Sequence, residues 1–250
     1  MLSTLRQRSH QLMASLAAVV PSFCVLCSIK GDTNICADCS AKFFNHRTPR
    51  CYQCADALPG LARNGMHSLC GNCLRNSPAF DATVVATNYA APVDQLILSL
   101  KFGANLVLAP LFSRLLANAL LDTDSKCIPM PTILTAVPLG PQRLIERGFN
   151  QALEIAKPLS RALAIPLDPH LAVRVRETDS QSTMHPSERR KNVRGAFTVP
   201  ETAIDLIKRR HIGIVDDVIT TGNTLDELAA TFKRFGAARV TNLVFARTLP

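Results

Sequence analysis

The 250-residue chain contains no tryptophan and only two tyrosines, and aromatic residues make up 5% of it. Its core must therefore be mainly aliphatic, and a 47% share of hydrophobic residues is enough to build one. No apolar run reaches the roughly 18 residues that cross a bilayer, so a membrane-spanning helix is not expected. Acidic residues are also scarce, because 19 of them face 28 lysines and arginines. The resulting net charge of +9 favours anionic partners, such as phosphorylated small molecules or nucleic acid.

The first twenty residues have some features of a secretion signal. Arg6 and Arg8 precede an apolar stretch. Ser15 interrupts that stretch, however, and no clear small-x-small cleavage site precedes Cys24. We therefore predict a helical lead-in over residues 1–22 and a cytoplasmic protein.

The cysteines are concentrated in one region. Eight of the nine form four Cys-x-x-Cys pairs, which are Cys24/Cys27, Cys36/Cys39, Cys51/Cys54 and Cys70/Cys73. Two thiolates separated by two residues grip one edge of a tetrahedral zinc ion, so four pairs predict two Cys₄ sites. Disulfides and an iron–sulfur cluster are the alternatives. Because four cysteines leave zinc no open position, both sites are expected to be structural.

The pairing of the four motifs has two solutions. Sequential pairing joins the first motif to the second and the third to the fourth. An interleaved cross-brace instead joins the first to the third and the second to the fourth. We favour sequential pairing because its short first loop closes at a lower entropy cost.

From residue 78 onward the pattern is that of an α/β protein. Strands are expected at 82–89, 132–137, 171–175, 211–215 and 240–246, and helices at 92–101, 106–121, 149–163 and 224–235. Pro158 is expected to kink or split the third helix. Strands that alternate with helices predict a largely parallel sheet, which binds ligands at the carboxyl ends of its strands.

The most informative motif runs from residue 212 to 224. An apolar strand ends at Asp216 and Asp217, and a Thr/Gly loop then opens an amphipathic helix. Helix N-termini bind phosphate, and Gly222 lets the backbone approach a ligand closely. A threonine of the loop is a candidate cap for the helix. The two carboxylates suit the hydroxyls of a ribose and can help to hold Mg²⁺.

This string resembles the phosphoribosyl-diphosphate (PRPP) loop of type I phosphoribosyltransferases. The resemblance implies that Asp216 and Asp217 face the ribose 2′ and 3′ hydroxyls, in the catalytic position. It also implies a 5′-phosphate cradle made of Thr220, Thr221, Gly222, Asn223 and Thr224.

Arginine clusters supply further candidates for anion binding. The candidates for a diphosphate are Arg143, Arg147, Arg174 and Arg176, the first two with the neighbouring Asn150–Gln151 amides. Candidates for nucleic acid are Arg189, Arg190, Lys191 and Arg194, in a long polar segment with few aromatic residues for base stacking. Solvated surface charge is the alternative interpretation of each arginine.

The cysteine pairs and the sequences at 89–102, 147–151, 192–197 and 215–224 occur in an order that resembles the competence protein ComF family (ComF/GntX type). The resemblance implies a double zinc ribbon over residues 23–77 and a phosphoribosyltransferase-like domain over 78–250. It implies bacterial proteins linked to natural transformation, which handle incoming single-stranded DNA.

Two function classes are left open by the sequence. One is an active transferase that joins ribose 5-phosphate from PRPP, held with Mg²⁺, to a nitrogenous base. The other is a binding module that retains the fold to hold a nucleotide or single-stranded DNA. A zinc scaffold for protein contacts is a third possibility, but it leaves the intact PRPP-type loop unexplained.

Overall fold

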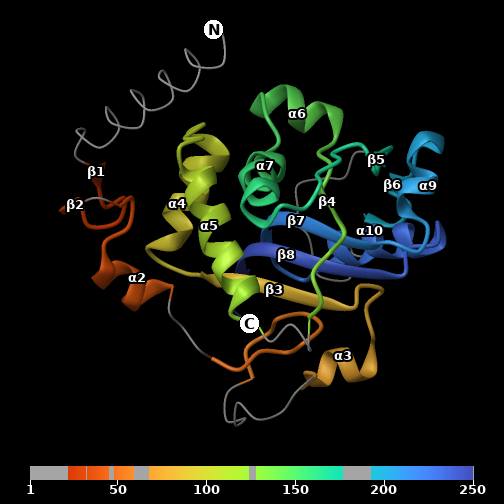
Figure 1. Ribbon diagram of the computed structural model, residues 1–250, viewed down its shortest axis with the longest axis horizontal. Coiled ribbons are helices and arrows are strands. Elements are labelled where there is room, and N and C mark those ends of the chain that lie inside the picture. The colour runs from red at the N-terminus through yellow and green to blue at the C-terminus, as the bar shows by residue number, and fades with distance from the viewer. Residues whose placement is uncertain are drawn as a thin grey trace, which may run out of the picture. The chain divides into compact units, whose positions relative to one another are not determined.

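Figure 1 shows the computed structural model, which describes residues 22–31, 33–44, 48–58, 68–123, 128–176 and 193–249. The chain divides into two compact units, Met1–His46 and Arg47–Pro250. This division lies between the two groups of cysteines, and the domain boundary after residue 77 that the family resemblance implied stays a prediction. The second cysteine group therefore shares a compact unit with the C-terminal sheet.

Thiols supply most of the buried side chains in the described part of the first unit. In its described part, β1 (Ser22–Phe23) pairs antiparallel with β2 (Lys30–Gly31), and α2 (Ala37–Phe43) follows. Its buried residues are Cys24, Ile35 and Cys39. A lead-in helix was predicted for residues 1–22. Residues 1–21 of that segment lie outside the described residues.

The second unit is built on a four-stranded parallel sheet, as predicted. Its strands are β3 (Ala82–Tyr89), β4 (Ile133–Ala136), β7 (His211–Ile219) and β8 (Arg239–Thr248). The spatial order is β3-β8-β7-β4, and every neighbouring pair is parallel. The longest strands, β7 and β8, thus lie in the middle of the sheet.

Helices connect the strands, as crossovers in a parallel sheet require. The longer ones are α4 (Val93–Phe102), α5 (Leu108–Leu121), α7 (Gln151–Leu163) and α10 (Asn223–Arg234). The shorter ones are α3 (Gly71–Arg75), α6 (Pro141–Arg147) and α9 (Ile204–Ile207), which follows the 3₁₀ turn η1 (Glu201–Ala203).

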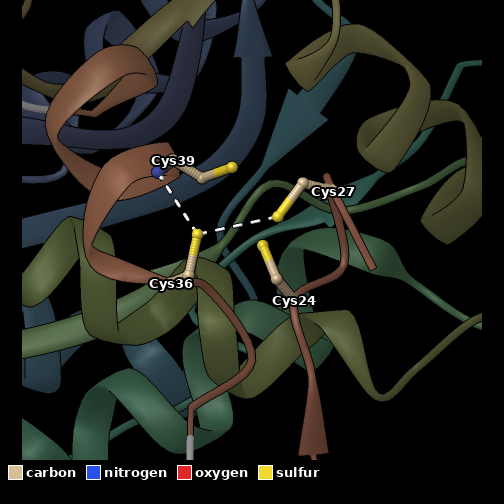
Figure 2. Close-up of side chains that lie close together, drawn as sticks. All are labelled: Cys24, Cys27, Cys36 and Cys39. Carbon is tan, nitrogen blue, oxygen red and sulfur yellow. Dashed lines mark hydrogen bonds between the residues drawn. The ribbon is translucent and has the colours of Figure 1, made fainter. Parts of the chain in front are cut away.

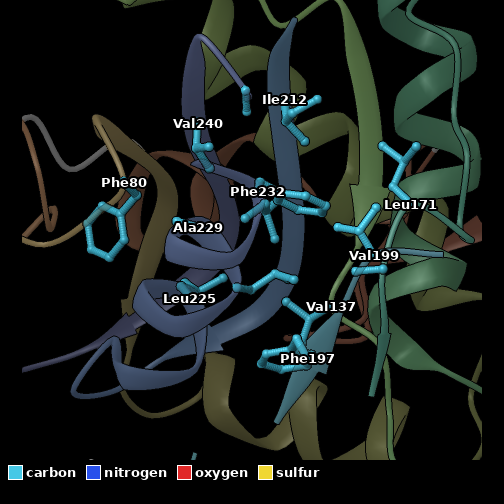
Figure 3. Close-up of a cluster of buried hydrophobic side chains, with 14 of the residues drawn as sticks. Phe80, Val137, Leu171, Phe197, Val199, Ile212, Leu225, Ala229, Phe232 and Val240 are labelled. Atoms are coloured by element: carbon cyan, nitrogen blue, oxygen red, sulfur yellow. The ribbon is translucent and has the colours of Figure 1, made fainter. Parts of the chain in front are cut away.

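Helices cover both faces of the sheet. Ile212 of β7 and Val240 of β8 belong to one buried cluster with Phe232 of α10 (Figure 3). On β8, Phe245 instead stacks on Phe112 of α5, with ring centroids 3.7 Å apart. Because alternate residues of a strand point to opposite faces, α10 covers one face and α5 the other. Both faces of the central strands are therefore buried, which suits their apolar sequences.

Three local predictions need correction. Of the two outcomes expected at Pro158, a kink or a split, the split does not occur, because α7 runs from Gln151 to Leu163 with Ile155 and Leu159 fully buried on either side of the proline. Proline has no backbone N–H and so removes one hydrogen bond from the helix. Burial of its neighbours therefore keeps the helix intact at this position. No threonine side chain caps α10, because its N-cap is Gly222, which makes no side-chain hydrogen bond.

The third correction concerns residues 171–175. Only Val173–Arg174 is a strand, β5, and it pairs antiparallel with β6 (Phe197–Thr198) in a separate two-stranded sheet. Leu171 is buried in the core, but Val175 is 56% exposed. The chain leaves the core at this point, so the arginines that follow do not end a strand of the parallel sheet.

Candidate functional site

The acidic pair lies where β7 extends beyond its neighbour β4. Pairing of β4 with β7 ends opposite Val215, where the N–H of Val137 donates to the Val215 carbonyl oxygen at 3.0 Å. Among the described strands, β7 is paired beyond this point with β8 alone. Asp216 and Asp217 thus occupy the carboxyl edge of the sheet, where parallel sheets bind their ligands.

Asp217 forms a buried ion pair with a lysine from another helix. The Nζ atom of Lys101, at the end of α4, lies 2.9 Å from Oδ2 of Asp217. Asp217 is 2% exposed, so its charge must be matched by a nearby cation. Sequence reasoning did not assign Lys101 to the site, because a single lysine at a helix end carries no local signal of its partner.

Asp216 occupies a different environment. It is half-buried, and its Oδ1 accepts a hydrogen bond from the backbone N–H of Asp217 at 2.9 Å. Burial and the adjacent Asp217 carboxylate together raise the pKa of Asp216 to about 8, against the opposing effect of Lys101. At neutral pH Asp216 therefore holds a proton in much of the population, which a cation or ligand can displace.

The loop after β7 presents backbone and hydroxyl groups to solvent. Thr220 and Thr221 are exposed, and Gly222 adopts the left-handed conformation (φ 81°) immediately before α10. Its carbonyl oxygen accepts the N–H of Asp226 at 2.8 Å, which closes the first turn of the helix. This geometry is suited to binding an anion at a helix N-terminus.

A cationic cavity of about 510 Å³ lies beside the acidic pair. Its lining residues are Lys101, Phe102, Ala104, Arg143, Glu146, Arg147 and Phe149. Lys101 belongs both to this cavity and to the ion pair with Asp217, so the two features adjoin. Three cations against one carboxylate make the cavity a favourable place for a polyanion.

Arg147 is held firmly in this cavity. Its Nη1 donates to Oε1 of the buried Gln151 at 2.5 Å, and its guanidinium lies 5.4 Å from the centre of the Phe102 ring. Burial lowers the pKa of Arg147, which nonetheless stays charged. The neighbouring Asn150, predicted as a possible ligand group, caps α7 and donates to the Val137 carbonyl oxygen instead.

The other predicted arginines are placed differently. Arg174 packs its guanidinium 5.5 Å from the Phe197 ring, and Arg176 donates to the carbonyl oxygen of Arg194 at 2.9 Å. Both therefore help to hold the β5–β6 segment together. Arg194 itself is exposed, whereas Arg189, Arg190 and Lys191 lie outside the described residues.

The cysteines form two clusters with sequential pairing, as predicted. Cys24, Cys27, Cys36 and Cys39 make the first (Figure 2), and Cys51, Cys54, Cys70 and Cys73 the second, each with its Sγ atoms within 4.8 Å of one another. In each, one pair of thiols lies 3.6 Å apart. A zinc–sulfur bond of about 2.3 Å gives tetrahedral S···S distances of about 3.8 Å, so the residues fit zinc.

The two clusters repeat one local design. The N–H groups of Ser28 and Ala55 donate to the carbonyl oxygens of Cys24 and Cys51, and both Ser28 and Ala55 have positive φ. The second pair of each cluster begins a helix. Cys36 and Cys70 are the N-caps, and their thiols accept backbone N–H groups at 3.4 and 3.5 Å. Such N–H···S bonds stabilise thiolates, the form that binds metal.

The ion pair between Lys101 and Asp217 generates a first prediction. Replacing Lys101 by methionine leaves a buried carboxylate without its partner, and we expect a loss of about 2–4 kcal/mol in the free energy of unfolding. The control is Lys157→Met, which removes an exposed pair with Glu154 and should cost less than about 1 kcal/mol. Adding Asp217→Asn to Lys101→Met should restore part of the loss. Equal losses at the two lysines, measured by urea denaturation, would contradict this account.

A second prediction follows from the raised pKa of Asp216. Because the folded pKa exceeds the unfolded one, the contribution of Asp216 to stability is complete below about pH 4 and is lost as the pH rises towards 8. Asp216→Asn fixes the neutral form. Its stability relative to the wild type should grow between pH 4 and pH 8 and reach roughly 1–3 kcal/mol, since partial exposure reduces the full effect. A pH-independent difference in unfolding free energy would show that the pKa is not raised.

Comparisons with known proteins agree with these features. A phosphoribosyl transferase domain model matches residues 150–248, and a double zinc ribbon model matches residues 15–76. Of the solved structures, a glutamine PRPP amidotransferase from B. subtilis has a TM-score of 0.36 and 16% identity. The match covers 55% of this chain and 26% of that one. In the described residues, none of the helices is both long and apolar enough to cross a membrane.

Two curated relatives match over most of their length. The DNA utilization protein YhgH of Escherichia coli K12 is 35% identical over 234 residues, which cover 92% of this chain and 99% of the relative. Competence protein F of Haemophilus influenzae is 31% identical over 207 residues, which cover 82% and 87%. Because both relatives are more than 30% identical to it over most of their length, this chain belongs to the competence protein ComF family.

Proposed function

We propose that this protein binds a phosphoribosyl ligand, either PRPP or a nucleotide, and handles single-stranded DNA during DNA uptake in natural competence. The observation that carries the proposal is the arrangement near the end of β7, where an acidic pair is followed, after residues 218–222, by the N-terminus of α10. Carboxylates accept hydrogen bonds from a ribose diol, and helix N-termini bind phosphate. A ribose 5-phosphate contains both a diol and a phosphate.

Each part of the ligand then has its own partners. Asp216 and Asp217 supply carboxylates for the ribose hydroxyls, and residues 220–224 wrap the 5′-phosphate. A diphosphate on the ribose enters the cationic cavity, where Arg143 and Arg147 offer guanidinium groups beside Lys101. Mg²⁺ accompanies the diphosphate, because this ion binds phosphate and carboxylate oxygens together. Since Asp216 is partly protonated at neutral pH, binding of the magnesium complex releases a proton.

The DNA role is supported by charge and by the names of the relatives. The similar proteins of E. coli and H. influenzae are named for DNA utilization and for competence. The net charge of +9 suits a polyanion, and Arg189, Arg190, Lys191 and Arg194 are our candidates for backbone contacts. We infer a cytoplasmic location, because eight cysteines grouped as two metal-binding sets are typical of proteins of a reducing compartment.

One observation favours a second candidate, an active transferase. The cationic cavity adjoins the acidic pair, so guanidinium groups are available to stabilise a departing diphosphate. In this alternative, ribose 5-phosphate passes from PRPP to a nitrogenous base in nucleotide salvage, and DNA plays no part. Release of diphosphate from PRPP in the presence of a base mixture distinguishes turnover from binding alone.

Two glycines that flank α10 provide a matched test of the phosphate loop. Gly222 and Gly236 both have positive φ, and an added Cβ at either would meet its neighbours at ordinary distances of 3.5 Å or more. Valine at either position should therefore cost about 1–3 kcal/mol of stability through backbone strain. Only Gly222→Val should also weaken binding of Mg-PRPP, by roughly tenfold or more, because its loop must present N–H groups to the phosphate. Calorimetric titration that finds equal affinities for the two variants would remove the loop from the site.

The DNA role is tested by salt dependence. Three phosphate contacts should make the affinity for an oligo-dT strand fall roughly tenfold or more between 50 and 200 mM salt. Replacing Arg189, Arg190 and Lys191 by serine should flatten this slope. The control variant removes the same charge from exposed Arg114, Arg161 and Arg210 and should keep the slope. A wild-type affinity that does not change with salt would argue against phosphate-driven binding.

A further inference from the structure

The two cysteine clusters share a local design but not their surroundings. The second lies in the same compact unit as the sheet, and its Cys54 packs against the buried cluster that includes Ile214 and Phe232. The loop that carries it is also bonded to β3, since the N–H of Thr83 donates to the Tyr52 carbonyl oxygen at 3.2 Å. The second cluster is therefore built into the domain that carries the candidate ligand site.

The chain that leaves this cluster contacts the first turn of α10. The backbone N–H of Ala79 donates to Oδ1 of Asp226 at 2.7 Å. The next residue, Phe80, is 2% exposed and packs in the same buried cluster as Leu225 of α10 (Figure 3). Its ring lies 3.9 Å from the position that a Cβ on Gly222 would take. One hydrogen bond and one ring thus support the phosphate loop from the side of the cysteines.

A small cleft of about 110 Å³ is lined both by residues of the second cysteine cluster and by residues of the phosphate loop. Cys54, Cys73 and residues 76–78 contribute to one side, and Thr221, Gly222 and Asn223 to the other. Asp226 lines the same cleft. A shift of the cysteine knuckles on loss of metal would therefore be transmitted directly to the loop.

We propose that Asp226 is a positioning residue that couples the second cysteine cluster to the phosphate loop, so that metal binding by Cys51, Cys54, Cys70 and Cys73 sets the affinity for 5′-phosphates. We expect no such influence from the first cluster, which belongs to the other compact unit. The ligand part of this inference rests on the proposed function. By the reciprocity of coupled equilibria, a bound 5′-phosphate must also protect the second metal site against chelation by the same factor.

Charge alone makes the opposite prediction for Asp226. A carboxylate beside an anion site repels a phosphate, so its removal should tighten binding if Asp226 acts only through its charge. If it acts by holding Ala79, removal should weaken binding. Asn at this position keeps an oxygen acceptor without the charge, so Asp226→Asn and Asp226→Ala separate the two effects.

The experiment uses the full-length zinc-loaded chain with ribose 5-phosphate as the probe. We expect Asp226→Ala to weaken binding about tenfold, and Asp226→Asn to stay within twofold of the wild type or to bind more tightly. Cys54→Ser/Cys73→Ser should lose one zinc ion per chain and at least tenfold in affinity. The matched control is Cys27→Ser/Cys36→Ser. It should also lose one zinc ion per chain, but its affinity for ribose 5-phosphate should stay within twofold of the wild type. Tighter binding by Asp226→Ala, or equal losses for the two double cysteine variants, would overturn the coupling.

Hydrogen exchange at the amides of residues 220–226 gives a readout that needs no ligand. The coupling predicts faster exchange there in Asp226→Ala and in Cys54→Ser/Cys73→Ser, at rates at least fivefold above the wild type. The Asp226→Asn and Cys27→Ser/Cys36→Ser variants should match the wild type. If wild-type protein does not bind ribose 5-phosphate, the proposed function fails, and exchange alone decides the coupling. Unchanged exchange in both of the first two variants would refute it.

Discussion

The pairing of β7 is the constraint on which the rest of the site depends. This strand is bonded to β8 along most of its length and to β4 from Ile212 to Val215, and residues 211–215 are all buried. A shift of one residue would move every side chain to the opposite face of the sheet, so the register is fixed. Because β4 ends earlier, the residues just beyond Val215 form an open edge. The positions of the acidic pair and of the loop at Gly222 are therefore set by the point at which β4 ends.

The site places two carboxylates side by side and three cations close together, and each group of like charges is stabilised by the other. A buried Asp217 is acceptable only with Lys101 beside it, and an adjacent Asp216 then titrates far above its usual range. The arginines of the neighbouring cavity repel Lys101 as well as each other. Folding of the core has to hold these groups together, and a magnesium-bound polyanion with hydroxyl groups would relieve both kinds of repulsion. Like charges that are held close together at a cost in stability are characteristic of functional sites.

The sequence was most informative where a pattern is local. Cys-x-x-Cys spacing predicted two thiol clusters, and the run from Ile212 to Gly222 predicted a strand, a loop and a helix N-terminus, because each depends on neighbours in the chain. Features that depend on distant contacts were missed. Lys101 meets Asp217 across 116 positions, and packing keeps α7 continuous through Pro158. The strand predicted around Val173 was misplaced because an apolar run does not specify which sheet it joins.

The cysteine clusters show that a repeated motif need not repeat its role. Their knuckles are alike in hydrogen bonding and in backbone conformation, so the local sequence alone would assign both to the same structural class. What differs is the context, since the second cluster belongs to the same compact unit as the core that supports α10, and the first cluster belongs to the other unit. Metal binding by four cysteines contributes folding free energy at either cluster. In the coupling that we propose, that free energy also bears on the geometry of the loop at Gly222, because the hydrogen bond from Ala79 to Asp226 joins the chain that leaves the second cluster to the first turn of α10.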